Sequence, residues 1–189
     1  MNIDDKTFDF AYIMAFRDAT MRNAFPRHSD EKDNDFHTRK RRIKNHSKPI
    51  VKNYIDAIMK DDNQMVPFTV INRLCDRDNT DQGFTFGNAQ KLVNMTAKYM
   101  FLSAYGDTEK RELFKNCHCP MDGVMMERLR EKCEEYTLKL EKFEIPWSRL
   151  KKDDEKSIKE YEKFQYYINQ IAKQENIYPI EVDFMFWDE

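Results

Sequence analysis

Apolar residues recur at helical spacing over most of the chain, and this pattern predicts a mainly α-helical protein. Phe8, Tyr12 and Ala19, for example, fall on one face of a helix. In the 88–104 segment the apolar residues cover more than one face, which predicts a central, buried helix. By the same pattern we predict helices over residues 4–24, 49–58, 66–75, 88–104, 108–115, 121–140 and 153–174.

Two segments lack this pattern. Residues 27–47 have little apolar content and no periodicity, so we expect a long mobile loop there, followed by a short helix that begins at Pro49. At residues 180–186 apolar side chains occupy alternate positions, which is typical of a short strand or an extended covering segment. We therefore predict one α-helical domain over residues 1–189, with an extended segment at its C-terminal end.

Composition adds limits to this picture. The chain has 189 residues, of which 40% are hydrophobic, so it can bury one core of ordinary domain size. Its 4 glycines lie within residues 83–123, and no Gly-rich phosphate-binding loop can be written. No apolar run reaches the length of a membrane span and no signal peptide begins the chain. We expect a cytoplasmic protein without membrane contact, in which the 4 cysteines are free thiols.

Positive charge is concentrated in one stretch although the formal net charge is −2. Residues 36–60 carry a local charge of +7, so the remainder sums to −9. Two interpretations stay open: these side chains contact nucleic-acid phosphates, or they coat a solvated loop. The basic residues concerned are Arg39, Lys40, Arg41, Arg42 and Lys44.

The glycine-containing window also carries a candidate chemical motif. Gly87 precedes Lys91 by four residues at the start of the predicted central helix, and Pro120-Met121-Asp122 follows one connection later. This arrangement resembles the helix-hairpin-helix DNA glycosylases of the oxoguanine type, most closely the archaeal 8-oxoguanine glycosylases. The resemblance implies a helical glycosylase fold and a base-excision activity with lyase chemistry. It also implies that Lys91 is the nucleophile, Asp122 the assisting carboxylate and Gly87 part of a hairpin that holds DNA.

The chemistry explains why these residue types are needed. A lysine attacks a sugar C1′ only when its amine is neutral, and burial or a nearby cation lowers the pKa of lysine from about 10.4. A carboxylate then stabilises the cationic sugar or moves a proton. The alternative is structural: Asp122 caps its helix and Lys91 is a solvated residue of the first turn.

Other polar and aromatic residues extend the candidate site. Gln90, Asn94 and Lys98 lie on or beside the stripe that carries Lys91. They line a nucleotide pocket or form the solvent edge of the helix. Trp187, among several aromatic residues, is a candidate to stack on a base, with core packing as the alternative.

The remaining motifs do not add a cofactor. Cys117, His118 and Cys119 are nearly adjacent, and such positions rarely converge on one ion, so we predict neither a metal nor another cofactor. The leading hypothesis is therefore a DNA glycosylase and lyase acting on an oxidised purine.

The alternative is a non-catalytic protein that sequesters a nucleotide or cyclic oligonucleotide in the same pocket. Ala89 in place of the usual second hairpin glycine, together with the acidic remainder of the chain, motivates it. A third hypothesis is a structural or interaction protein without a pocket. The sequence leaves open whether the protein is an enzyme and what its oligomeric state is.

Overall fold

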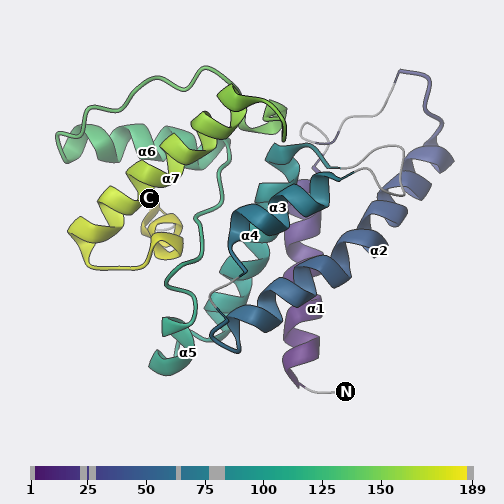
Figure 1. The fold of residues 1–189 in the computed structure, drawn as a ribbon, viewed down its shortest axis with the longest axis horizontal. Helices are drawn as coiled ribbons and strands as arrows, with labels where there is room; N and C mark the ends of the chain where they lie inside the picture. The colour runs from purple at the N-terminus through teal and green to yellow at the C-terminus, as the bar shows by residue number, and fades with distance from the viewer. Residues whose placement is uncertain (1–2, 22–24, 26–28, 63–64, 77–83, 187–189) are drawn as a thin grey trace.

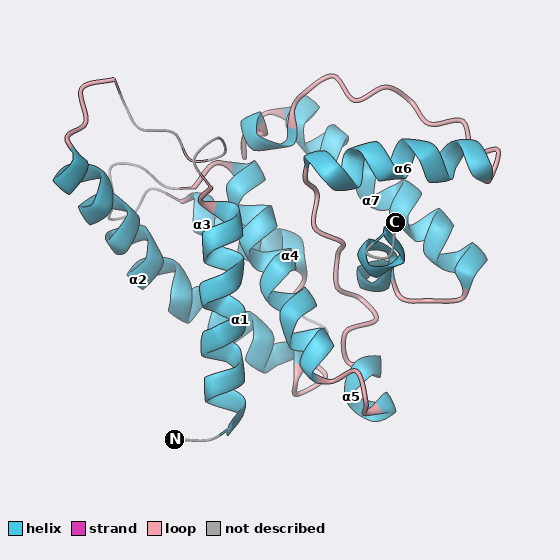
Figure 2. Ribbon diagram, turned by 180° about the vertical axis from the view of Figure 1, so that it is seen from behind, coloured by secondary structure: helices cyan, strands magenta, loops and turns pink. Residues whose placement is uncertain are grey.

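The structure, a computed structural model, describes all residues except 1–2, 22–24, 26–28, 63–64, 77–83 and 187–189. The described chain contains helices and no strand, which confirms the mainly α-helical prediction (Figures 1 and 2). The elements are α1 (Ile3–Ala19), α2 (Asp33–Ile58), α3 (Pro67–Cys75), α4 (Phe86–Ser103), α5 (Thr108–Glu112), α6 (Gly123–Glu135), α7 (Glu155–Glu175), and the 3-10 helices η1 (Trp147–Arg149) and η2 (Pro179–Phe186).

Helix α4 is the central helix, as predicted. Every residue from 86 to 98 is buried, and α1 and α3 make its most extensive helix contacts. Thr85 caps the helix by accepting a hydrogen bond from the Asn88 N–H at 3.1 Å. Helices α1 to α4 form one group, and α6, α7 and η2 form a second group on the other side of α4 (Figure 1). The polar residues of α4 are therefore interior residues.

Most predicted helices are present with small shifts of their ends. Helices α3 and α7 agree with the predicted segments to within about two residues. Helix α1 ends at Ala19, before the predicted residue 24, and α6 ends at Glu135, before the predicted residue 140. No helix among the described residues is long and apolar enough to cross a membrane.

The predicted loop over residues 27–47 is wrong from residue 33 onward, because α2 is a continuous helix of 26 residues that passes through Pro49. Only a narrow stripe of α2 is buried, so its first half shows little apolar content. Pro49 lacks the N–H that would bond the carbonyl four residues earlier. Beside that gap, Ser47 Oγ donates to the Ile43 carbonyl at 2.6 Å and Tyr12 Oη donates to the Lys44 carbonyl at 2.7 Å. These hydroxyl groups bind carbonyl groups of α2 just before Pro49, where the sequence predicted the start of a separate helix.

The C-terminal prediction is also wrong, because residues 179–186 form η2 rather than a strand or an extended segment. Glu181 accepts hydrogen bonds from the Tyr178 N–H at 2.9 Å and from Arg111 at 2.6 Å. Asp183 forms an ion pair with Lys98 of α4. The apolar residues of this segment alternate with acidic ones, which resembles the pattern of a strand. In the structure the acidic side chains of Glu181 and Asp183 are buried too, each with a cationic partner.

An extended segment, residues 116–122, connects α5 to α6 and is called the strap below. It passes between α4 and the group of α7 and η2 (Figure 2). Gln90 of α4 donates to the Met121 carbonyl at 2.6 Å and accepts from the Met121 N–H at 3.1 Å. Gln165 of α7 makes the same pair of bonds with Cys119, at 2.7 and 3.2 Å. Two side-chain amides thus satisfy a buried backbone that has no neighbouring strand.

Candidate functional site

Lys91 and Asp122, separated by 31 residues, meet in the structure. Lys91 Nζ lies 2.9 Å from Asp122 Oδ2, and the two side chains are 9% and 21% exposed. The other carboxylate oxygen, Oδ1, accepts the Met125 N–H at 3.0 Å and so caps α6. Asp122 therefore is a capping residue and also the partner of Lys91, whereas the expectation that Lys91 is a solvated residue is wrong.

The position of Asp122 depends on the strap. Gln90 fixes both backbone groups of Met121, the residue immediately before Asp122. Because Gln90 is also adjacent to Lys91 in α4, one turn of helix carries the amine and the group that places its carboxylate. Gln90 thereby keeps Asp122 of the strap beside the Lys91 amine.

Trp147 completes the immediate surroundings of the ammonium group. Lys91 Nζ lies 4.9 Å from the centroid of the Trp147 ring, a cation–π contact. The backbone of Trp147 packs directly on Gly87, where a methyl group would lie 1.9 Å from the Trp147 carbonyl oxygen. Gly87 thus lies in close contact with the backbone of η1. No spacing in the sequence connects Trp147 to Gly87 or Lys91, so this neighbour of the candidate site could not be predicted from the sequence.

The first amides of α4 already have partners within the protein. The Gly87 N–H donates to the Leu150 carbonyl at 3.4 Å, and the Asn88 N–H donates to the Thr85 hydroxyl oxygen at 3.1 Å. These are the groups that a helix N-terminus would offer to a phosphate. In this structure they secure η1 and the helix cap.

Gln90, Asn94 and Lys98 are buried, so they are not the solvent edge of α4. Asn94 donates to Tyr161 Oη at 2.9 Å, and Tyr161 Oη also lies 2.8 Å from His118 Nδ1. Burial lowers the pKa of His118 to about 4, because the imidazole loses the water that would solvate its charged form. Gln90 and Asn94 thus bind the strap, and Lys98 binds Asp183 of η2.

The predicted basic residues lie on α2. Arg39 makes two hydrogen bonds with Glu31, both at 2.7 Å, and its guanidinium group lies over the Phe25 ring. Lys40 donates to the Thr20 carbonyl at 3.2 Å, while Arg41 and Arg42 are exposed and Lys44 is partly buried. These five residues lie on α2, whereas Lys91 lies on α4. The predicted base-stacking residue Trp187 lies outside the described residues.

Burial raises the pKa of the thiol of Cys117 to about 12, and it also raises the pKa of the Cys119 thiol well above its usual value. A thiol held in its neutral form is a poor metal ligand. In the described part of the chain, no group of three His, Cys, Asp or Glu side chains is placed to hold a metal ion.

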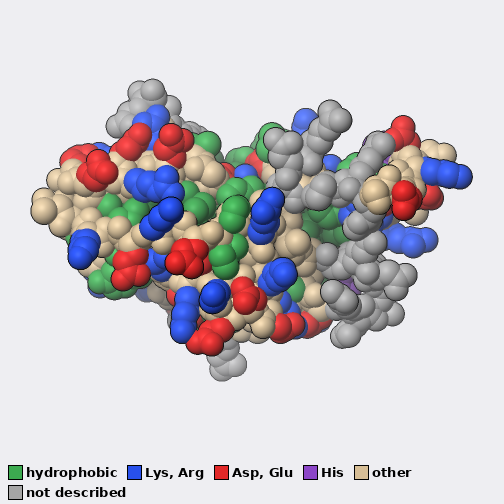
Figure 3. All heavy atoms as spheres, turned by 90° about the horizontal axis from the view of Figure 1, so that it is seen from above, with side chains coloured by type: hydrophobic (Ala, Val, Ile, Leu, Met, Phe, Trp, Pro, Cys, Tyr) green, Lys and Arg blue, Asp and Glu red, His purple; other side chains and the backbone are tan. Residues whose placement is uncertain are grey.

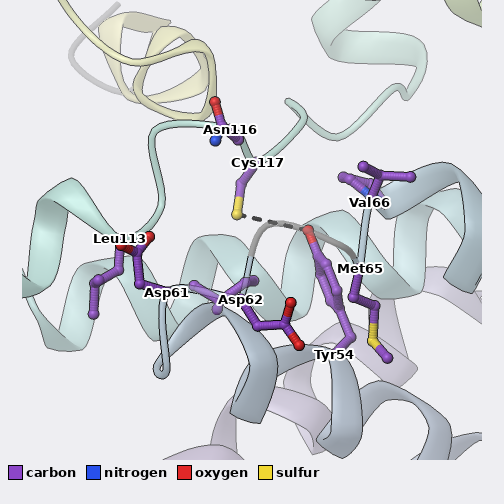
Figure 4. A pocket seen from close by; sticks show the side chains of 10 residues that line it. Tyr54, Asp61, Asp62, Met65, Val66, Leu113, Asn116 and Cys117 are labelled. Atoms are coloured by element: carbon purple, nitrogen blue, oxygen red, sulfur yellow. Dashed lines mark hydrogen bonds between the residues drawn. The ribbon is translucent and has the colours of Figure 1, made fainter.

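Two cavities lie apart from Lys91 and Asp122. One of about 120 Å³ is bounded by the end of α2 and the beginning of the strap, and in it Tyr54 Oη lies 3.6 Å from Cys117 Sγ (Figure 4). A second, of about 420 Å³, lies between α1 and the C-terminal ends of α2 and α4. It is lined by apolar residues such as Phe8 and also by Lys52 and Lys110. Neither cavity includes the predicted site.

Comparison of the chain with known protein families, with curated proteins and with solved structures found no match.

Proposed function

We propose that the protein is a DNA glycosylase and lyase that acts on an oxidised purine, with Lys91 as nucleophile and Asp122 as the assisting carboxylate. The observation that supports this most is the 2.9 Å contact between Lys91 Nζ and Asp122 Oδ2. An amine must be unprotonated when it attacks, and Asp122 is placed to take its proton. The Trp147 ring beside the amine offers a flat surface next to the reacting atoms.

The chemistry uses only these groups and water. The neutral Nζ forms a bond to C1′ of the damaged nucleotide while the bond from C1′ to the base breaks. The base leaves with that electron pair and is protonated. The sugar ring opens to a Schiff base on Lys91. Water takes a proton from C2′, the electron pair forms a C2′–C3′ double bond, and the C3′–O3′ bond breaks to expel the 3′-phosphate. Water then hydrolyses the Schiff base and frees the Lys91 amine.

Borohydride reduction tests this proposal, because it converts a Schiff base into a stable covalent link. We expect the wild-type protein to be trapped on duplex DNA containing 8-oxoguanine, and Lys91→Ala to give no trapped product. Lys115→Ala, which removes an exposed lysine of the same type, should trap normally. Absence of trapping in the wild type, or equal trapping in Lys91→Ala, would contradict the proposal.

Asp122→Asn separates catalysis from helix capping. Asparagine caps helices about as well as aspartate, so the bond to the Met125 N–H can be kept while the proton acceptor is lost. We expect the trapping rate to fall by about 100-fold. Thermal stability should fall as well, because the buried Lys91 ammonium group loses its carboxylate partner although the helix cap is kept. If the trapping rate is unchanged, Asp122 is a cap only.

A second candidate function is sequestration of a free nucleotide or cyclic oligonucleotide without turnover. The observation that favours it is the use of the Gly87 N–H by the Leu150 carbonyl, since a duplex phosphate then cannot bind that amide. Calorimetric titration with a panel of nucleotides distinguishes the two. Tight binding with unchanged ligand supports sequestration, and failure of every nucleotide to bind removes it.

A further inference from the structure

Helices α1 and α2 run antiparallel along a seam of charged residues. Lys52 of α2 lies 3.6 Å from Asp5 of α1, and one turn further Lys48 lies 2.8 Å from Asp9. Each helix repeats after four residues, so the same register continues along both. At the first two positions of this seam, each lysine of α2 therefore faces an aspartate of α1.

The pairing stops in the other half of the seam. Continuing in steps of four, α1 presents Ile13 and Arg17, while α2 still presents Lys44 and Lys40. Arg17 and Lys44 both repel the charge of Lys40, and the pKa of Lys40 is lowered by its partial burial and then by these two cations. The complementary carboxylates of the first half are replaced by a neutral residue and by a third cation.

Among the described residues, no carboxylate is within ion-pair distance of Arg17, Lys40 or Lys44. The nearby Arg39, in contrast, is neutralised by Glu31, as Lys48 is by Asp9. A fourth cation, the exposed Arg41, lies about 100° around the helix from Lys40 and about 60° from Lys44. We call the group Arg17, Lys40, Arg41 and Lys44 the open seam.

The open seam lies at the same end of α4 as Lys91. The Thr20 carbonyl accepts from Lys40, and the adjacent Ala19 carbonyl accepts from Asn88 of α4 at 2.6 Å. Asn88 is three residues before Lys91. Figure 3 shows the molecule from above. On that surface, Lys and Arg side chains lie among acidic ones, also at the end where α2 begins.

We propose that the open seam binds the phosphate backbone of DNA. Lys40 and Lys44 are separated by a rise of about 6 Å along α2, which compares with about 3.4 Å of duplex axis per phosphate on one strand. Lys40 and Lys44 can therefore contact neighbouring phosphates of one strand. Such a polyanion relieves the repulsion within the cluster, which no carboxylate of the described residues neutralises. The inference rests on the proposed function only for the choice of DNA as the polyanion.

Arg17→Asp tests the inference, because it extends the paired half of the seam. The new carboxylate should pair with Lys40, so the melting temperature should be equal to or above that of the wild type. Binding of a fluorescein-labelled DNA duplex should weaken by about tenfold or more, and the slope of log Kd against log salt should fall by about 1. A mutation that improves charge pairing in the fold would thus reduce DNA binding.

Lys159→Asp is the matched control, since it makes the same change in net charge at an exposed pair on α7. It should change the affinity by less than about twofold at moderate salt. Ile13→Asp, at a position 40% exposed, adds a carboxylate beside Lys44 without removing a cation and should also weaken binding. The inference is overturned if wild type binds no DNA, if the seam variants bind as wild type does, or if Lys159→Asp weakens binding equally.

Two further measurements separate this inference from the catalytic proposal. Repeating the titration with one strand alone shows whether single-stranded or duplex DNA is the preferred source of phosphates. Trapping by borohydride at DNA concentrations near Kd should fall in Arg17→Asp in proportion to the DNA bound, and it should be equal in wild type and Lys159→Asp. If wild type is not trapped but Arg17→Asp still loses DNA binding, the catalytic proposal fails and the open seam stands.

Discussion

At the scale of single residues, the backbone of Trp147, 60 residues away in sequence, leaves no room for a side chain at Gly87. Its α-carbon faces the Trp147 carbonyl, although it does not have a left-handed backbone conformation that would require glycine. The constraint is therefore space alone. Because Trp147 also lies over Lys91, packing at Gly87 is coupled to the candidate site.

Gly87→Ala should destabilise the protein by about 1 to 3 kcal/mol, since the added methyl group must displace backbone atoms of η1. Urea unfolding measures the change. Gly106→Ala is the matched control, because nothing lies within 4 Å of a methyl group there, and it should be neutral or stabilising. Equal stability of the two variants would show that η1 does not press on Gly87.

At the scale of elements, the agreement between sequence and structure followed the strength of the apolar pattern. The 88–104 helix was predicted well because apolar side chains cover several of its faces. Helix α2 was missed because charged residues hide a narrow buried stripe and Pro49 resembles a helix start. The contact between Lys91 and Asp122 was anticipated from a motif. The roles of Gln90 and Gln165 were not, since glutamine carries no sequence signal for binding a backbone 31 or 46 residues away.

Gln90→Met should lower the free energy of unfolding by about 2 to 4 kcal/mol. The substitution keeps the volume but leaves both backbone groups of Met121 without their partner, at about 1 to 3 kcal/mol for each buried group. Gln174→Met, at an exposed position of the last turn of α7, is the control and should change stability little. If both variants unfold at the same urea concentration, Gln90 does not secure the strap.

At the scale of the whole molecule, the strap joins the two groups of helices, and His118 lies within it. Its imidazole has a pKa near 4 in the folded protein and about 6.5 when exposed. The unfolded chain therefore binds more protons between these values. The contribution of neutral His118 to stability is complete above about pH 6.5 and is lost as the pH falls toward 4.

Urea unfolding at pH 7 and pH 5 tests this pH dependence. The wild type should lose about 2 kcal/mol more than His118→Gln between these pH values, because glutamine does not titrate. Titrating carboxylates affect both proteins and cancel in the comparison. An identical loss in both proteins would mean that His118 is already protonated at pH 5 in the folded state.

The ion pair of Lys98 with Asp183 has a consequence for the order of events during synthesis. Lys98 lies in the central helix, yet its carboxylate partner is 85 residues later in the chain. A buried ammonium group without this carboxylate is costly, so we expect α4 to reach its final environment only after Asp183 has left the ribosome. Although domains commonly begin to fold from the N-terminal end during translation, we therefore expect this core to close late.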